Sequence, residues 1–164
     1  MKRALASLLF GVSVVGCAAT EFGGSLRGES GPVAWEVTNL RQTRSNDTGH
    51  APTITWWFTL VLHNKSSSAI TFRELTSGMV VPGGDSFGGQ GTQPYRRMLK
   101  AGDEMRLEQT FAFNCRDCDA GRAQSVFSKG VVRVLQFEGQ DDQGRSVKAT
   151  ANIHLDGSTG DLLH

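Results

Sequence analysis

TITWWFTLVLH, residues 53–63, is the strongest β-strand signal in this sequence. Successive side chains of a strand point to opposite faces of its sheet. One face of this strand is wholly apolar and carries Ile54, Trp56, Phe58, Leu60 and Leu62. The other face is more polar and carries Thr55, Trp57, Thr59, Val61 and His63. Such a pattern predicts a central strand whose apolar face lies in the core.

The same alternation recurs on both sides of this strand and predicts an all-β fold. Further strands are expected at residues 33–40, 69–75, 79–81, 95–99, 105–113, 131–138 and 145–155, with turn residues between them. Residues 145–155 alternate most regularly, which is typical of an antiparallel sheet with one solvated face. A helical pattern is suggested only for a short turn at residues 123–127.

About seven short strands at this spacing resemble an immunoglobulin-like or fibronectin-like β-sandwich, here spanning residues 32–156. A small closed β-barrel is the alternative architecture. The sequence has no cysteine pair flanking a buried tryptophan at the spacing of antibody domains, so the resemblance rests on strand pattern. Residues 157–164 are expected to form a C-terminal tail.

The first 16 residues have the composition of a signal peptide. Lys2 and Arg3 precede an apolar run over residues 4–15. The run has 12 residues. Because a helix needs about 20 residues to cross a bilayer, a permanent transmembrane segment is the weaker interpretation. The segment ends in the four residues Val14-Val15-Gly16-Cys17.

These four residues resemble the lipobox of bacterial lipoproteins. The resemblance implies cleavage before Cys17 and attachment of a diacylglycerol to its thiol, and two or more acyl chains anchor a protein stably to a bilayer. Ala18 follows, rather than the aspartate that resembles an inner-membrane retention signal, so the outer membrane facing the periplasm is expected. Residues 17–31 are rich in Gly, Ser and charge and are predicted to form a flexible tether. The alternative is a secreted protein with an ordinary signal peptide.

The composition of the mature chain fits one domain. Removal of 16 of the 164 residues leaves 148, which can bury most of their apolar surface. Lys2 and Arg3 leave with the signal peptide, so 15 basic residues face 16 acidic ones and the net charge is −1. This balance gives no electrostatic reason to expect nucleic acid as a partner. The expected partners are the lipid bilayer, through Cys17, and a protein of the cell envelope.

Cys115 and Cys118 form the one reactive-looking motif. In an oxidising compartment they are expected to form a small structural disulfide at the end of a strand. Metal ligation and redox catalysis are the alternatives, and they define a second candidate function as a periplasmic thiol-handling or metal-handling protein. His50, His63 and His154 lack diagnostic spacing for a metal site, and the βαβ context of a redox pair is missing. No metal or cofactor is therefore assigned.

Two features suggest a binding surface made of Trp57, Val61, His63 and Phe87. Trp57 shares the polar strand face with Val61 and His63 and is either covered by other structure or exposed to a partner. Residues 82–94 contain five glycines and two prolines and predict a long loop. Phe87 at its tip is either an anchor for a partner or part of a loop without function.

The sequence favours a non-enzymatic function. It contains no Ser-x-x-Lys and no His-Glu-x-x-His motif. Asp141 and Asp142 lack the alternating oxygen ligands of a calcium loop and predict a solvated turn.

The expected protein is a membrane-anchored lipoprotein that binds or scaffolds within the bacterial envelope. A surface-exposed adhesin or inhibitor on the same sandwich is the alternative.

Overall fold

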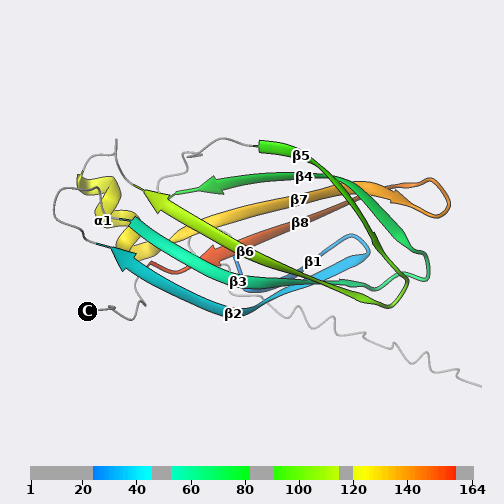
Figure 1. Ribbon diagram of the computed structural model, residues 1–164, viewed down its shortest axis with the longest axis horizontal. Helices are drawn as coiled ribbons and strands as arrows, with labels where there is room; N and C mark the ends of the chain where they lie inside the picture. The colour runs from blue at the N-terminus through cyan, green and yellow to red at the C-terminus, as the bar shows by residue number, and fades with distance from the viewer. Residues whose placement is uncertain (1–23, 46–52, 82–90, 115–119, 158–164) are drawn as a thin grey trace, which may run out of the picture.

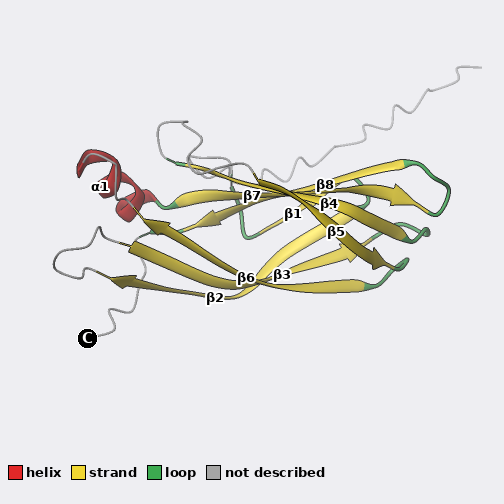
Figure 2. Cartoon of the chain, turned by 45° about the horizontal axis from the view of Figure 1, so that its top comes forward, coloured by secondary structure: helices red, strands yellow, loops and turns green. Residues whose placement is uncertain are grey.

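Two antiparallel sheets of four strands each pack face to face in the computed structural model, which describes residues 24–45, 53–81, 91–114 and 120–157 (Figure 1). Figure 2 shows the sheets as two layers. The predicted all-β sandwich is confirmed. Eight strands are present where about seven were predicted. The strand at Arg27–Ser30 was not predicted, and the two segments predicted at residues 69–75 and 79–81 form one strand.

The first sheet is built around the strand that the sequence marks most strongly. Its order is β1-β2-β3-β6, so β3 is an inner strand, as predicted. The strands are β1 (Arg27–Ser30), β2 (Val33–Ser45), β3 (Thr53–Asn64) and β6 (Glu104–Asn114). The predicted apolar face of β3 is buried, each of its five side chains being 2% exposed or less. Phe72, Leu135 and Phe137 of the second sheet belong to the same core.

The second sheet has the order β5-β4-β7-β8. Its strands are β4 (Ile70–Val80), β5 (Gly91–Leu99), β7 (Val131–Asp141) and β8 (Ser146–Leu155). The prediction of two strands at residues 69–75 and 79–81 was wrong, because β4 pairs continuously with β7 through residues 76–78. Residues 91–94 were predicted to lie in a loop, but they extend β5. Pro94 is tolerated there because β5 is an edge strand.

The distribution of strands between the sheets follows the immunoglobulin-like plan. When β1 is set aside, the first, second and fifth strands lie in one sheet and the third, sixth and seventh in the other. The fourth strand, β5, differs from the antibody constant domain, because it pairs with the third strand and not with the first sheet. The chain passes between the sheets after β3, after β5 and, through α1, after β6. The turns after β3 and β5 lie at one end of the sandwich and α1 lies at the other (Figure 1).

The N-terminal segment corrects the predicted tether, because its described part from Gly24 onward belongs to the fold. Arg27–Ser30 pairs with β2, and Ser25 forms a parallel bridge with Ile153 of β8. The amide of Thr150 also donates to Ser30 Oγ at 2.9 Å. The free edges of β2 and β8 offer backbone N–H and C=O groups that need hydrogen-bond partners. The described part of the N-terminal segment supplies these partners and is therefore ordered, although its composition is typical of a flexible tether.

The helix α1 (Ala120–Lys129) replaces the shorter helical turn expected at residues 123–127. It ends at Gly130, whose positive φ of 76° allows its amide to donate to the Val126 carbonyl at 2.8 Å. Val126 is fully buried. Among the described residues, none of the helices has the length and apolar character needed to span a membrane.

Candidate functional site

The predicted binding surface on β3 is largely occupied by its own neighbours. Val61 is fully buried, so its assignment to an exposed surface was wrong. It lies between Glu36 and Arg106 in the register of the sheet, and long charged side chains cover apolar surface with their stems. His63 lies between two carboxylates, with Nε2 3.7 Å from Glu36 Oε1 and Nδ1 3.8 Å from Glu104 Oε2.

The sequence left open whether Trp57 is covered by other structure or exposed to a partner, and the structure shows an intermediate case. Its side chain is partly buried, and the guanidinium of Arg41 lies 5.7 Å from the centroid of its ring. A cation in this position interacts favourably with the face of the indole. The charged and aromatic side chains of this face therefore contact one another, and few of them are left to bind a ligand.

Several predicted site residues lie outside the described part of the chain, namely Cys17, His50, Phe87, Cys115 and Cys118. The disulfide, metal and redox alternatives for the two later cysteines therefore stay predictions. His63 and His154 lie on β3 and β8, in different sheets, so the structure does not bring them together. Within the described ranges, no group of three or more His, Cys, Asp or Glu side chains could hold a metal ion.

Residues 84–88, Gly-Asp-Ser-Phe-Gly, match the Gly-x-Ser-x-Gly pattern of the α/β-hydrolases. That pattern marks a nucleophile where a strand turns sharply into a helix. Here it falls in the sequence between β4 and β5, two strands of an all-β sandwich, and outside the described residues. The element that follows this segment is the strand β5, whereas the α/β-hydrolase pattern leads into a helix.

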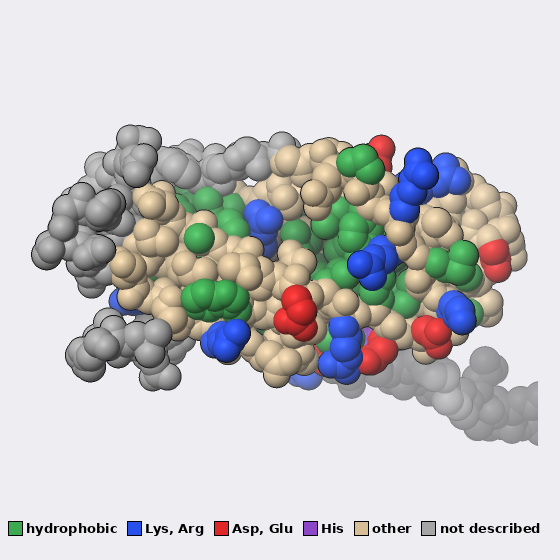
Figure 3. Space-filling view, in the orientation of Figure 1, with side chains coloured by type: hydrophobic (Ala, Val, Ile, Leu, Met, Phe, Trp, Pro, Cys, Tyr) green, Lys and Arg blue, Asp and Glu red, His purple; other side chains and the backbone are tan. Residues whose placement is uncertain are grey.

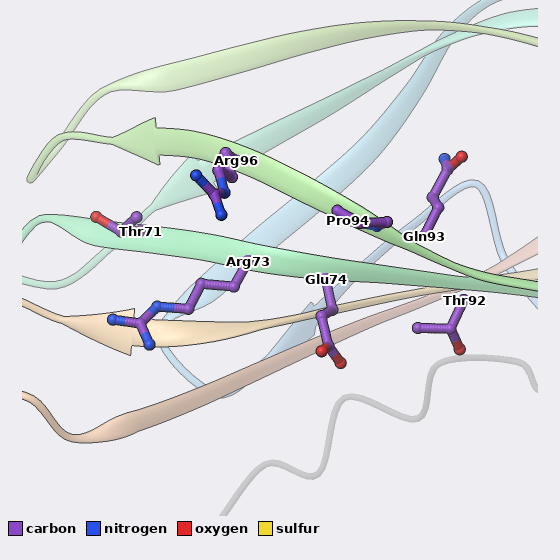
Figure 4. Close-up of a pocket in the computed structure, with 7 residues that line it drawn as sticks. All are labelled: Thr71, Arg73, Glu74, Thr92, Gln93, Pro94 and Arg96. Atoms are coloured by element: carbon purple, nitrogen blue, oxygen red, sulfur yellow. The ribbon is translucent and has the colours of Figure 1, made fainter.

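A groove of about 710 Å³ lies on β4 and β5. All of its lining residues except Pro94 have polar or charged side chains, and they are Thr71, Arg73, Glu74, Thr92, Gln93, Pro94 and Arg96. Figure 4 shows that Thr71, Arg73 and Arg96 gather toward one end, with Glu74 and Pro94 next along the groove and Thr92 and Gln93 beyond them. The charged groups are thus sorted by sign along its length.

A β-bulge in β4 creates this arrangement. Phe72 pairs with Gly139 of β7 and Glu74 pairs with Glu138, so Arg73 is an extra residue on β4. Such a residue bends the strand and redirects side chains. The burial pattern shows the result, because Arg73 and Glu74 are both exposed between the buried Phe72 and Leu75.

Tyr95 fixes the opposite wall of the groove. Its ring packs edge-on against Phe137, with centroids 5.5 Å apart, and its hydroxyl donates to Met105 Sδ at 3.8 Å. Burial raises the pKa of Tyr95 above its usual value, and the charge of Arg97 offsets part of this rise. Because Tyr95 points into the sandwich, its neighbours Pro94 and Arg96 point outward.

The charged side chains of the groove are not used by the fold. Within the described part of the chain, Arg73, Glu74 and Arg96 make no ion pair and no side-chain hydrogen bond. Other arginines are engaged, as in the pair of Arg106 with Glu104 at 2.8 Å and that of Arg145 with Asp141 at 2.6 Å.

Met98 adds an apolar element beside the arginine end of the groove. It pairs in register with Thr71, and its side chain is 63% exposed, more than that of any other large hydrophobic residue described. Arg73 and Arg96 were not predicted as site residues. The available signal was the run Pro94-Tyr95-Arg96-Arg97, in which basic residues follow a proline on a short edge strand.

Comparisons with known proteins support the fold alone. No family model and no curated protein matches the sequence. A solved structure, the structural genomics target SoR45, superposes with a TM-score of 0.54 at 7% identity, over 81% of this chain and 94% of that one. A Bordetella pertussis protein with the provisional name ApaA gives a TM-score of 0.45 at 8% identity, over 73% and 89% of the two chains. At these identities the likeness to SoR45 indicates a shared architecture and nothing about function.

Proposed function

We propose that this protein is a lipid-anchored, non-enzymatic binding module of the bacterial cell envelope, and that the groove on β4 and β5 is its binding surface. One observation carries the choice of surface. Arg73 and Arg96 line the same groove, and neither has an ion-pair partner among the described residues. Arginine is well suited to recognition because its planar guanidinium binds carboxylates and phosphates through paired hydrogen bonds.

The groove is also suited to binding because its walls are rigid. Its residues lie on β4 and β5, and β4 pairs with β5 from Ile70 to Ser77 and with β7 from Ile70 to Val80. Side chains held on paired strands lose less conformational entropy when a ligand arrives than side chains on loops do. The bulge at Arg73 supplies the unusual side-chain directions without giving up this support.

The lipobox at residues 14–17 supplies the anchor in this proposal. Residues 18–23 separate Cys17 from the first described residue, Gly24. At 3.3–3.6 Å per residue, the seven steps from Cys17 to Gly24 reach at most about 25 Å. The domain would thus stay close to the membrane. Ser25 bridges β8, whereas β5 forms the other edge of the same sheet, so the groove would lie away from the anchored edge.

The anchor is tested by expressing the full chain in a lipoprotein-processing bacterium with an alkyne-tagged palmitate. We expect the label on the wild-type protein and its loss in the Cys17→Ser variant. Mass spectrometry should find a mature chain that begins at an acylated Cys17. A chain that begins elsewhere, or that begins there without lipid, would overturn the anchoring.

The binding surface is tested with a photo-crosslinking amino acid at Thr92, which lines the groove, in intact cells. The matched control places the same probe at Thr110, an exposed residue of β6 that pairs with Trp57. We expect an adduct of defined mass from Thr92 that disappears when Arg73 and Arg96 are both changed to Gln. An adduct from Thr110 alone would move the binding surface to the Trp57 face. Absence of adducts from both sites would contradict a binding function.

A further inference from the structure

We propose that the groove selects a dipolar peptide segment, with a carboxylate held between Arg73 and Arg96 and an ammonium group held by Glu74. This inference rests on the proposed function, because it names the ligand class for the same groove. It follows from three observations: the arginines and Glu74 lie at different places along the groove, Glu74 lies opposite a second glutamate, and the spacing of Glu74 and Arg96 matches an extended peptide.

The arginine end favours a carboxylate. Arg73 comes from the bulge of β4 and Arg96 from β5, so two guanidinium groups approach the groove from two strands. Figure 4 places Thr71 at the same end, where its hydroxyl can donate a further hydrogen bond. Planar donors from two directions match the two oxygens of a carboxylate. Each of the two charges is free to take a ligand, because no described residue pairs with it.

The Glu74 end favours a cation. Glu74 lies directly opposite Glu138 in the register of β4 and β7, and like charges in that position repel. Glu138 has partners of its own, since Lys148 Nζ lies 3.3 Å and Gln136 Nε2 2.6 Å from its Oε1. Glu74 has none among the described residues. An ammonium group bound here would relieve the repulsion, whereas a simple anion would increase it.

The spacing of the two ends fits an extended peptide. Glu74 is opposite Pro94, and Arg96 is two residues further along β5. Two residues of a strand span about 7 Å, which is also the distance between side chains i and i+2 on one face of an extended ligand. An acidic and a basic residue separated by one residue therefore match the groove. Met98, at the arginine end, offers an apolar contact to a flanking side chain.

The probe is the peptide acetyl-Asp-Ser-Lys-amide, titrated against the full chain in detergent and followed by ligand-observed NMR. The comparison peptides are acetyl-Asn-Ser-Lys-amide, which lacks the carboxylate, and acetyl-Asp-Ser-Gln-amide, which lacks the ammonium. Inorganic phosphate serves as the simple anion. We expect the dipolar peptide to bind at least fivefold more tightly than either comparison peptide.

Variants assign each end of the peptide. Arg73→Gln and Arg96→Gln should each remove the preference for Asp over Asn, and Glu74→Gln should remove only the preference for Lys over Gln. The matched control is Arg27→Gln, which neutralises an exposed arginine on β1 and should change neither preference. Urea unfolding midpoints equal to the wild type would show that the variants are folded.

Three results would overturn the inference. The first is equal binding of all three peptides, and the second is the absence of any binding. The third is phosphate binding that becomes stronger in Glu74→Gln, since this would define a simple anion site. If Thr92 still forms crosslinks in cells but acetyl-Asp-Ser-Lys-amide does not bind, the binding function stands and the ligand class is wrong. If Thr92 forms no crosslinks and the peptide does not bind, the binding function is contradicted as well.

Discussion

Arg133 lies over the ring of Phe111, with its Cζ 4.6 Å from the ring centroid. The two residues belong to β7 and β6, so the contact joins the two sheets. Arg133 Nη1 also donates to the Gly78 carbonyl at 3.2 Å, and Phe111 stacks on Trp56 with centroids 5.8 Å apart. Burial lowers the pKa of Arg133 from its usual value. The contact lies on the side where β5 and β6 are both edge strands, and where Figure 3 shows apolar side chains at the surface.

We expect Arg133→Met and Phe111→Leu to be coupled in a double-mutant cycle. A partly buried cation over an aromatic ring contributes about 1 kcal/mol, so the double variant should lose about 1 kcal/mol less than the sum of the single ones. The free energies of unfolding are measured in urea. Arg41 and Trp57 form the matched pair on the solvated face, at a longer 5.7 Å, and should couple more weakly. Additive losses at Arg133 and Phe111 would contradict the contact.

We expect Gly139→Ala to destabilise the fold by about 2 kcal/mol, in the range for overpacking a well-packed site. Gly139 pairs with Phe72 beside the bulge of β4, and a Cβ atom there would lie 2.7 Å from Phe72 Cα. Backbone cannot yield as a flexible side chain does. The bulge should shift, so peptide binding at Arg73 should weaken as well. Gly91→Ala on β5 is the control, because nothing lies within 4 Å of its added Cβ, and it should unfold like the wild type.

The strands of this protein could be predicted where their pattern is local, and the groove could not. The alternation around Trp56 predicts a buried central strand because it needs no knowledge of the neighbours. The exposure of Arg73 depends on its being an extra residue relative to β7, which no local pattern reveals. Arg27–Ser30 becomes a strand only because the edge of β2 is free. Pairing between strands that are distant in the sequence determines both the exposure of Arg73 and the strand at Arg27–Ser30. The same pairing places Val61 between two neighbouring strands, where it is buried.

We expect Asp141 to make the stability depend on pH. Burial raises the pKa of Asp141. Hydrogen bonds from Arg145 and Gln143 and the charge of Arg145 lower it by more than this rise, so the folded-state pKa is below the usual value. Stability from such a group is fully present above the unfolded pKa of about 3.9. It is lost as the pH falls through the folded-state pKa.

The measurement compares urea unfolding of the wild type and Asp141→Asn between pH 7 and pH 3. The wild type should be the more stable at pH 7, because an asparagine at this position could still accept from the amides of Gln143 and Arg145 but would lose the negative charge beside the Arg145 guanidinium. It would also lose the Oδ2 atom that accepts from Arg145 Nε at 2.6 Å. The difference should shrink as the pH falls below about 4. Asp142→Asn, next to it in the turn, is the control and should track the wild type. A difference that stays constant over this pH range would exclude the role of Asp141.

Asn64 connects the turn that follows β3 with the turn that follows β5, and it is 2% exposed. Its Nδ2 donates to the carbonyls of Ser68 at 2.8 Å, Leu99 at 3.2 Å and Lys100 at 3.1 Å. Its Oδ1 accepts from the amide and hydroxyl of Ser66 at 3.0 and 2.7 Å. Asn64→Ala removes these partners, and we expect a loss of about 3 kcal/mol because buried polar groups are left unpaired.

Asn64→Asp separates the donor role of this side chain from its size. The carboxylate keeps the bonds from Ser66, but at pH 7 it places a negative charge against the three carbonyl oxygens that Nδ2 had bound. Asn64→Asp should therefore be less stable than Asn64→Ala at pH 7 in urea unfolding. It should recover part of the difference near pH 4, because a protonated acid can donate one hydrogen bond. Ser67→Ala, an exposed neighbour in the same turn, is the control. Equal stability of the two Asn64 variants at both pH values would mean that the contacts to Leu99 and Lys100 do not hold the turns together.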